Sequence, residues 1–281
     1  MTQAGSAGPR RARLGALSFL NTRPLTYGLE AGDAGEGAPF ELIYDVPSAC
    51  ADALAAGRID AGLIPVIEYA CRPGDCIVPD VAIGAVGEVL TVRLFFRGDL
   101  ADVRRIAADT SSRTSVALLR ILLKTKYGIV PEIVPAPPDL DAMLHCADAA
   151  LLIGDPVLPL VEGSVDDAQR HSLDLGQQWY ELTGLPFVFA FWSGAEDALT
   201  SAQILRLQQA RRAGEDHISE IATAFQRERA GSAELYETYL REHICYDLGD
   251  QQLAGLREFY RLSFEQGIIP AIPQLRCYPG P

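Results

Sequence analysis

The chain has 281 residues, which is enough for one or two domains with a buried core. Hydrophobic residues make up 48% and charged residues 22%, a globular composition that excludes a largely disordered chain. The formal net charge of −13 argues against nucleic acid and anionic membranes as partners, because both bind clustered positive charge. An anionic substrate must therefore be held by local hydrogen-bond donors.

The N-terminal part of the sequence predicts alternating strands and helices. The predicted elements are strands over 14–17, 40–44 and 58–64, a short helix near Pro24, a helix over 49–56 capped by Ser48, and a helix opened by Pro65. Strand–helix–strand units of this kind form right-handed parallel crossovers, and ligands bind beyond the carboxyl ends of the strands. Asn21, Ser48 and Ile64 fall at those ends.

A second series of elements begins after a long β-type run at 85–96. The predicted elements are strands over 105–108, 132–134 and 149–153, a helix from the serine-rich turn to Gly128, and a helix over 139–146. Asp155 follows the last of these strands, and we expect it to cap the helix opened by Pro156, with ligand contact as the alternative. A second β run at 187–192 precedes a C-terminal part that is almost wholly helical.

The two β runs bracket a complete α/β unit. We therefore expect a discontinuous first lobe of residues 1–94 and 191–281, with residues 95–190 inserted as a second lobe. Clefts between domains favour small-molecule sites, so a ligand is expected there.

The segment Asp109–Ser115 is rich in hydroxyl groups and precedes a helical pattern marked by Val116, Leu119 and Leu123. Helix N-termini expose unpaired N–H groups and a partial positive charge, so they bind anions. Arg113 could add a fork of donors for a carboxylate. A hydroxyl-rich cap without a ligand is the alternative, and the segment by itself leaves both interpretations open.

Cysteine and histidine spacing predicts no metal site. The six cysteines lack the two-residue spacing of zinc or thioredoxin-like motifs, and the four histidines show no ligand spacing. The apolar run Leu14–Leu17 is too short for a secretory signal, and no segment is long enough for a transmembrane helix. We expect a cytoplasmic protein with free thiols.

Five segments, in this order along the chain, resemble one known family. They are Ser-Phe-Leu-Asn-Thr-Arg-Pro-Leu (18–25), Gly-Arg-Ile-Asp-Ala-Gly-Leu-Ile-Pro (57–65), Ser-Ser-Arg-Thr-Ser-Val (111–116), Leu-Ile-Gly-Asp (152–155) and Thr-Gly-Leu-Pro-Phe-Val-Phe-Ala (183–190). Together they resemble the chorismate dehydratases of the futalosine route to menaquinone. The resemblance covers nearly the whole chain and is weakest in the C-terminal helical part.

The resemblance implies a type II periplasmic-binding-protein fold, with two α/β lobes and the ligand in the cleft between them. It implies that chorismate loses its ring hydroxyl as water and becomes 3-[(1-carboxyvinyl)oxy]benzoate, without a metal or organic cofactor. Because the converging turns hold no histidine or paired carboxylates, the substrate's own carboxylate would take the ring proton and Asn21 would orient the reacting groups. The expected substrate contacts are Ser18, Ser48, Ile64, Thr91, Ser111, Ser112, Arg113, Thr114, Ser115 and Asp155.

Two positions depart from the family pattern. Thr91 stands where a serine is usual, so it keeps the hydroxyl and adds a methyl group, and Arg23 stands where an apolar residue is common. We expect Arg23 to point away from the cleft.

Three alternative functions stay open at this point, and the sequence sets no oligomeric state. A non-catalytic solute-binding protein would share the lobes. The sister enzyme that forms a dihydroxynaphthoate typically has a Ser-x-Cys-Pro-Asn-Asp-type turn where this chain has Ser18–Pro24. A ligand-sensing domain is the third, although no DNA-binding segment is visible.

Overall fold

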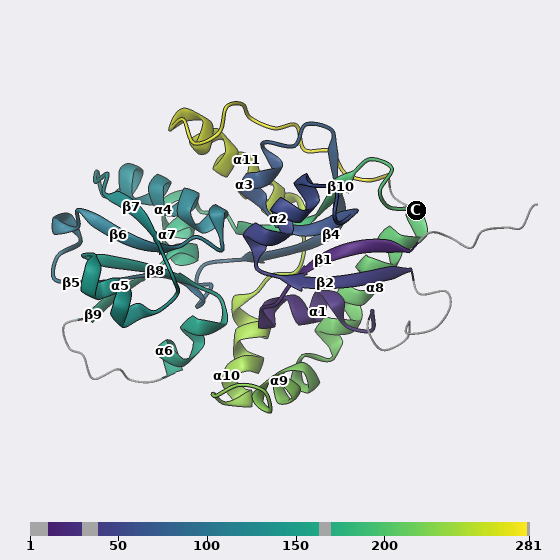
Figure 1. Cartoon of the computed structure of the whole chain (residues 1–281), viewed down its shortest axis with the longest axis horizontal. Coiled ribbons are helices and arrows are strands. Elements are labelled where there is room, and N and C mark those ends of the chain that lie inside the picture. Colours follow the sequence, from purple (N-terminus) through teal and green to yellow (C-terminus); the bar gives the residue numbers. More distant parts are fainter. Residues whose placement is uncertain (1–10, 30–38, 163–169, 280–281) are drawn as a thin grey trace, which may run out of the picture.

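The fold contains two five-stranded sheets, each flanked by helices, in a computed structural model that describes residues 11–29, 39–162 and 170–279 (Figure 1). In order, the first sheet contains β2 (Phe40–Asp45), β1 (Ala12–Leu17), β3 (Ala61–Pro65), β10 (Phe187–Ala195) and β4 (Asp75–Ala85). The second contains β7 (Glu132–Ala136), β6 (Arg105–Asp109), β8 (Ala149–Ile153), β5 (Val92–Arg97) and β9 (Arg170–Asp174). We call the parts built on them the first and the second lobe.

The predicted parallel crossovers are present in the first lobe. β1 pairs in parallel with β2 and β3, and the helices α2 (Pro47–Ala55) and α3 (Val66–Tyr69) precede and follow β3. Every residue of β3 is buried, as expected for a strand with both faces covered. The expectation for Ser48 was wrong: α2 begins at Pro47 with Val46 as its N-cap, so Ser48 lies inside the first turn.

The expected β run at 85–96 is two strands with a turn between them. β4 ends at Ala85 and pairs antiparallel with β10, whereas β5 begins at Val92 and pairs antiparallel with β8 and β9. Residues 92–94, which were expected in the first lobe, therefore belong to the second sheet. Residues 187–190, which were expected in the second lobe, belong to the first sheet. The turn at 86–91 is one of two crossings between the sheets, and it places Thr91 between the lobes.

The second lobe also follows the predicted pattern. β6 pairs in parallel with β7 and β8. Its helices are α4 (Arg113–Lys126), α5 (Leu140–Cys146), α6 (Leu158–Glu162) and α7 (Leu175–Thr183). Asp139 caps α5, and Ser112 caps α4 by accepting the N–H of Ser115.

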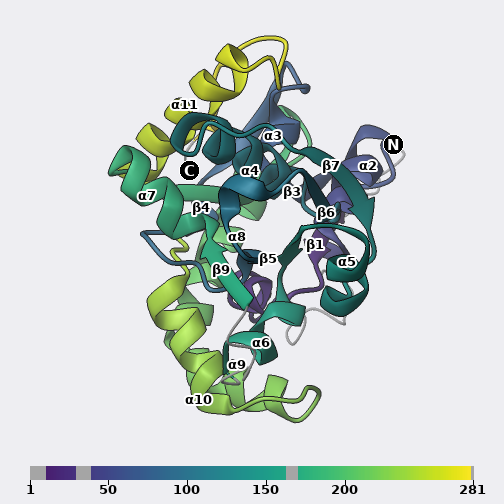
Figure 2. The same ribbon diagram turned by 90° about the vertical axis from the view of Figure 1, so that its left-hand side faces the viewer.

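The C-terminal part is helical and reaches both lobes. It contains α8 (Ser201–Asp216), α9 (Ile218–Gln226), α10 (Ala233–Thr238), a π-helical turn (Tyr239–His243) and α11 (Asp250–Glu265). Ser232 caps α10, and α11 begins at Asp250 after Gly249. α9 and α10 lie on the same lower side as α6 in both views (Figures 1 and 2), and α11 packs against β10 and α4.

An aromatic cluster holds α7, β10 and α11 together. Trp179, Phe187 and Phe259 are fully buried and meet edge to face, with ring centroids 5.1 to 6.3 Å apart. Burial of one such side chain stabilises the fold by about 1.5–3 kcal/mol. The cluster therefore joins a helix of the second lobe to a strand of the first. Within the part of the chain that the structure describes, no helix is both long and apolar enough to span a bilayer.

Candidate active site

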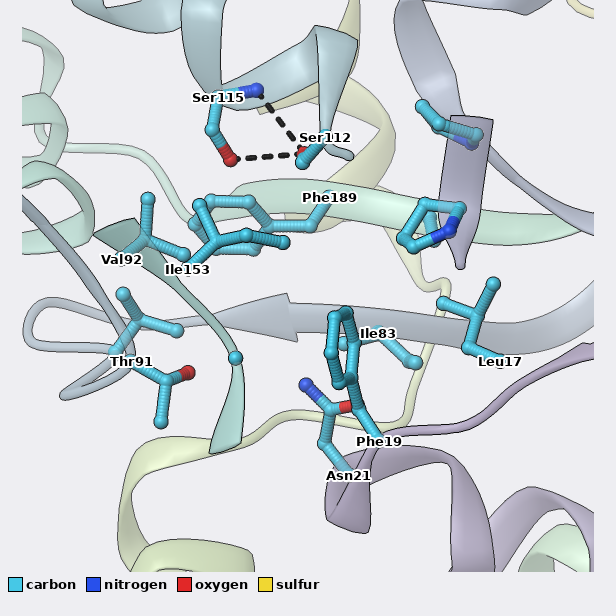
Figure 3. Close-up of a pocket in the computed structure, with 15 residues that line it drawn as sticks. Leu17, Phe19, Asn21, Ile83, Thr91, Val92, Ser112, Ser115, Ile153 and Phe189 are labelled. Carbon is cyan, nitrogen blue, oxygen red and sulfur yellow. Dashed lines mark hydrogen bonds between the residues drawn. The ribbon is translucent and has the colours of Figure 1, made fainter. Parts of the chain in front are cut away.

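A cavity lies between the two sheets, with an empty volume of about 480 Å³ including its open mouth. Its lining residues are Leu17, Phe19, Asn21, Pro47, Pro65, Ile83, Val89, Thr91, Val92, Ser112, Ser115, Ile153, Gly154, Phe189 and Ala190. They come from the carboxyl ends of β1, β3 and β8 and the residues after them, the starts of α2 and α4, strands β4 and β10, and the crossing at 86–91 with the first residue of β5. Figure 3 shows Ser112 and Ser115 on one side of this cavity and Asn21 and Thr91 on the opposite side.

One polar side is the first turn of α4. Ser112 Oγ lies 2.9 Å from Ser115 Oγ and accepts the Ser115 N–H at 3.3 Å. Both side chains are buried, and they share a helix face because they are three residues apart. The partial positive charge of the helix start adds to these hydroxyl donors, so this side of the cavity suits a carboxylate.

The opposite polar side is formed by Asn21 and Thr91. Asn21 Nδ2 donates to the hydroxyl of Tyr239 at 3.0 Å, and the same hydroxyl lies 2.9 Å from Thr91 Oγ1. Asn21 is only 9% exposed, and its Oδ1 has no hydrogen-bond partner among the described residues. An uncharged acceptor and a hydroxyl are therefore placed together at this side.

Between the polar sides the cavity wall is apolar. Phe19, Phe189, Ile83 and Ile153 lie there (Figure 3). Phe19 packs against Gly154 of the second lobe, where a Cβ would lie 2.8 Å from the ring and φ is 72°. Glycine is required at this contact on both counts. None of the lining residues is ionisable, so a bound anion meets only hydroxyl, amide and backbone dipoles.

Several residues predicted to contact substrate do not line the cavity and instead join the two lobes around it. The Ser48 N–H donates to the carbonyl of Ser111 at 2.9 Å, and the Ile67 N–H donates to Thr114 Oγ1 at 3.3 Å. Arg113 pairs with Asp52 at 2.9 Å and with Glu68 at 3.2 Å. We call these contacts, together with that of Asp155, the rim contacts.

Asp155 makes the rim contact on the side of Asn21. Its carboxylate accepts the Leu20 N–H at 3.0 and 3.2 Å and does not cap the following helical turn, whose N-cap is Gly154. The expected capping role was therefore wrong. Burial raises the pKa of Asp155 to about 6, although the Leu20 N–H and the charges of Arg229 and Arg23 oppose the shift.

The remaining expected contacts lie elsewhere. Ser18 is exposed at the end of β1, and Ile64 packs in a small cluster with Ala51, Leu54 and Ile59. Arg23 does not line the cavity and pairs with Glu228 at 2.5 Å while covering the ring of Phe225.

The sequence reasoning missed the apolar wall and Tyr239. Phe19 lies inside the segment 18–25 that resembles the family, so its position two residues before Asn21 could have marked it as a cavity residue. Tyr239 is more than 200 residues away from Asn21, and no pattern in the C-terminal helices marks it. Among residues 11–29, 39–162 and 170–279, no three histidine, cysteine or acidic side chains are placed to hold a metal ion.

Comparison with known proteins places this chain in a family. A family model described as "Menaquinone biosynthesis" matches residues 12–265. The chain is also 30% identical over 260 residues to chorismate dehydratase from Thermus thermophilus, across 88% of this chain and 93% of that relative. The chain belongs to the chorismate dehydratase family. The family suggested by the five sequence segments is thus confirmed.

Similarity to solved structures shows the fold of this chain. One, from Archaeoglobus fulgidus, has a TM-score of 0.74 at 18% identity and covers 92% of this chain and 98% of its own. The alkanesulfonate-binding protein SsuA from Xanthomonas axonopodis pv. citri has a TM-score of 0.66 at 15% identity, covering 95% and 97%. The expected two-lobed, periplasmic-binding-protein-like α/β fold is confirmed.

Proposed function

We propose that this chain is a chorismate dehydratase, a hydro-lyase that removes water from chorismate to give 3-[(1-carboxyvinyl)oxy]benzoate in menaquinone biosynthesis. Family membership supports the reaction. The observation that carries the proposal on the structural side is the cavity itself, with polar groups on two opposite sides and an apolar wall between them. Chorismate has a carboxylate for the side of Ser112 and Ser115, an apolar ring for the wall, and a ring hydroxyl that can donate to Asn21.

In the proposed complex, one carboxylate binds at Ser112 and Ser115, where hydroxyl groups and the start of α4 supply donors. The reacting edge of the ring faces Asn21 and Thr91. Phe19 and Phe189 cover the ring and exclude water, so the hydrogen bonds act in a medium of low dielectric constant.

The elimination removes a proton and a hydroxyl from neighbouring ring carbons. The C–H bonding electrons become the new ring double bond, and the C–O bonding electrons leave with the hydroxyl. The hydroxyl takes up one proton, equivalent to the one removed from the ring, and departs as water. Because the cavity lining contains no ionisable side chain, we propose that the substrate's own side-chain carboxylate takes the ring proton. Asn21 is the proposed catalytic residue, which orients the reacting groups by hydrogen bonds. Aromatisation drives the step, and positioning supplies the catalysis.

Incubation with chorismate tests this proposal, with products followed by mass. A product lighter by one water, absent with Asn21→Ala, is the expected result. Tight binding without conversion would instead support a solute-binding protein. The sister enzyme forms its dihydroxynaphthoate from a cyclic futalosine derivative, and turnover of that substrate alone would support the sister enzyme.

We further propose that the protein acts in the cytoplasm and needs no cofactor. All six cysteines are free thiols, three of them exposed, which suits a reducing compartment. We also propose that the two lobes are separate domains whose boundaries lie close to residues 94 and 190, as the sequence suggested.

A further inference from the structure

We propose that Tyr239 is a positioning residue for the dehydration, holding Asn21 and Thr91 in the orientation that the reaction needs. This inference rests on the proposed function. Tyr239 does not line the cavity, but its fully buried hydroxyl lies between the two polar side chains of one cavity side. It is the point at which the C-terminal helical region meets both of them.

The chemistry of the three groups sets the direction of the hydrogen bonds. An amide nitrogen only donates, so the Tyr239 oxygen accepts from Asn21 Nδ2. A buried phenol proton without an acceptor is costly, so this proton goes to Thr91 Oγ1. Burial raises the pKa of Tyr239 far above its ordinary value, which keeps that proton in place.

Two consequences follow for the cavity. With Nδ2 held by Tyr239, the other end of the Asn21 amide, Oδ1, has no protein partner within the described chain and is available as an acceptor for substrate. With Oγ1 of Thr91 accepting from Tyr239, the Thr91 hydroxyl proton is free to be donated. One buried phenol thus fixes an acceptor and a donor side by side.

The backbone around Thr91 is held in the same way. Leu90 has a φ of 65°, a left-handed conformation that costs a non-glycine residue about 1–3 kcal/mol. Asp174 accepts the N–H groups of Val89 and Leu90 at 3.0 and 2.8 Å, and Arg93 Nε donates to the Leu90 carbonyl at 3.0 Å. These hydrogen bonds from Asp174 and Arg93 hold Leu90 in its strained conformation. The turn in this conformation places Thr91 beside the hydroxyl of Tyr239.

The other end of the π-helical turn is anchored to the same loop. His243 Nδ1 lies 3.1 Å from the carbonyl oxygen of Glu88, so the turn meets loop 88–91 at two points, through Tyr239 and His243. π-helical turns in proteins are frequently found at functional sites. The π-helical geometry of this turn therefore orients Tyr239 toward Asn21 and Thr91.

The test compares Tyr239→Phe with Tyr246→Phe in chorismate turnover. Tyr246 is also fully buried nearby, but its hydroxyl has no partner among the described residues, so the same atom is removed without loss of a hydrogen bond. We expect Tyr239→Phe to lower kcat by about 10- to 100-fold, with KM within about threefold. Tyr246→Phe should leave both constants within about twofold of the wild type.

A double-mutant cycle with Thr91→Val sharpens the result. If the hydroxyls act as one chain, the kcat losses of Tyr239→Phe and Thr91→Val will be clearly less than multiplicative. Wild-type turnover with an unchanged kcat in Tyr239→Phe would overturn the inference, as would equal losses in the two phenylalanine variants. A wild type that does not convert chorismate would refute the proposed function instead.

A measurement on the wild-type protein covers the case that Tyr239→Phe does not fold. One side-chain amide proton of Asn21, assigned by its absence in Asn21→Ala, should exchange slowly with solvent. Two rapidly exchanging protons would overturn the inference.

Discussion

The cavity and its rim use the same short segments for different purposes. In the first turn of α4, Ser112 and Ser115 face the cavity, whereas Arg113 and Thr114 contact the first lobe. Residues three apart share a helix face, and those between them point elsewhere. The serine-rich segment therefore both lines the cavity and contacts the first lobe.

The segment after β1 shows the same division. Asn21 lines the cavity, while the preceding N–H of Leu20 is held by Asp155 from the second lobe. Leu20 therefore contacts the second lobe, whereas its neighbour Asn21 lines the cavity. The cavity lining is therefore uncharged, whereas the charged residues nearby join the two lobes.

The largest effect is expected from Asn21→Ala, which removes the proposed catalytic residue. Loss of a preorganised hydrogen-bonding group costs about 10²–10³-fold in kcat, so turnover should become undetectable or nearly so. Thr22→Ala is the matched control, because Thr22 lies in the same turn and its buried hydroxyl has no partner in the described structure. Steady-state assays and thermal melts check both. An active, folded Asn21→Ala would refute the assignment.

Ser115→Ala should weaken substrate binding at the opposite side. A hydrogen bond to a charged group contributes about 1.5–3 kcal/mol, so KM should rise by about tenfold or more. Ser112→Ala should raise KM in the same way. It should also lower the unfolding free energy by about 1 kcal/mol, because Ser112 caps α4. Ser111 lies outside the cavity lining, and Ser111→Ala should change KM by less than about threefold. Equal effects at all three serines would contradict the division between cavity and rim.

Asp155→Asn tests the rim through the pH dependence of stability. Burial raises the pKa of Asp155 from 3.8 to about 6, so the folded state binds this proton more tightly than the unfolded state. The resulting stabilisation is complete below about pH 4 and is lost as the pH rises through 6. The unfolding free energy of Asp155→Asn relative to wild type should therefore increase between pH 4 and pH 7, on the order of 2 kcal/mol.

Denaturant unfolding at several pH values measures this difference, and Asp148→Asn supplies a control of opposite sign. The N–H groups of Arg104 and Arg105 lower the pKa of Asp148, so its contribution is lost as the pH falls. A difference for Asp155→Asn that does not vary with pH would show that its carboxylate is not buried against Leu20.

The smallest effect is expected at the exposed end of the rim. Asp52→Asn removes one partner of Arg113, but both side chains are substantially exposed. Exposed ion pairs contribute about 0–1 kcal/mol, so KM should change by less than about fivefold, and the change should vanish in about 0.5 M salt. A tenfold effect would place Arg113 in direct contact with substrate.

The sequence by itself determined the family, the α/β fold and four polar cavity residues. Strand and helix periodicity are local, and Asn21, Ser112 and Ser115 follow predicted strands, where open α/β sheets bind ligands. Thr91 lay inside the predicted β run at 85–96 and was expected only from the family resemblance. The serine-rich turn was therefore predictable as a site, although not which of its residues face inward.

Only the tertiary structure decided which side chains meet. Three features depend on packing between segments far apart in the chain. They are the contact of Thr114 with Ile67, the strained turn that places Thr91 beside Tyr239, and the contact of Tyr239 with Asn21. Local sequence sets the period of an element but not its orientation against a distant partner. For that reason the rim contacts and the role proposed for Tyr239 became visible only when the two lobes and the C-terminal helices were seen together.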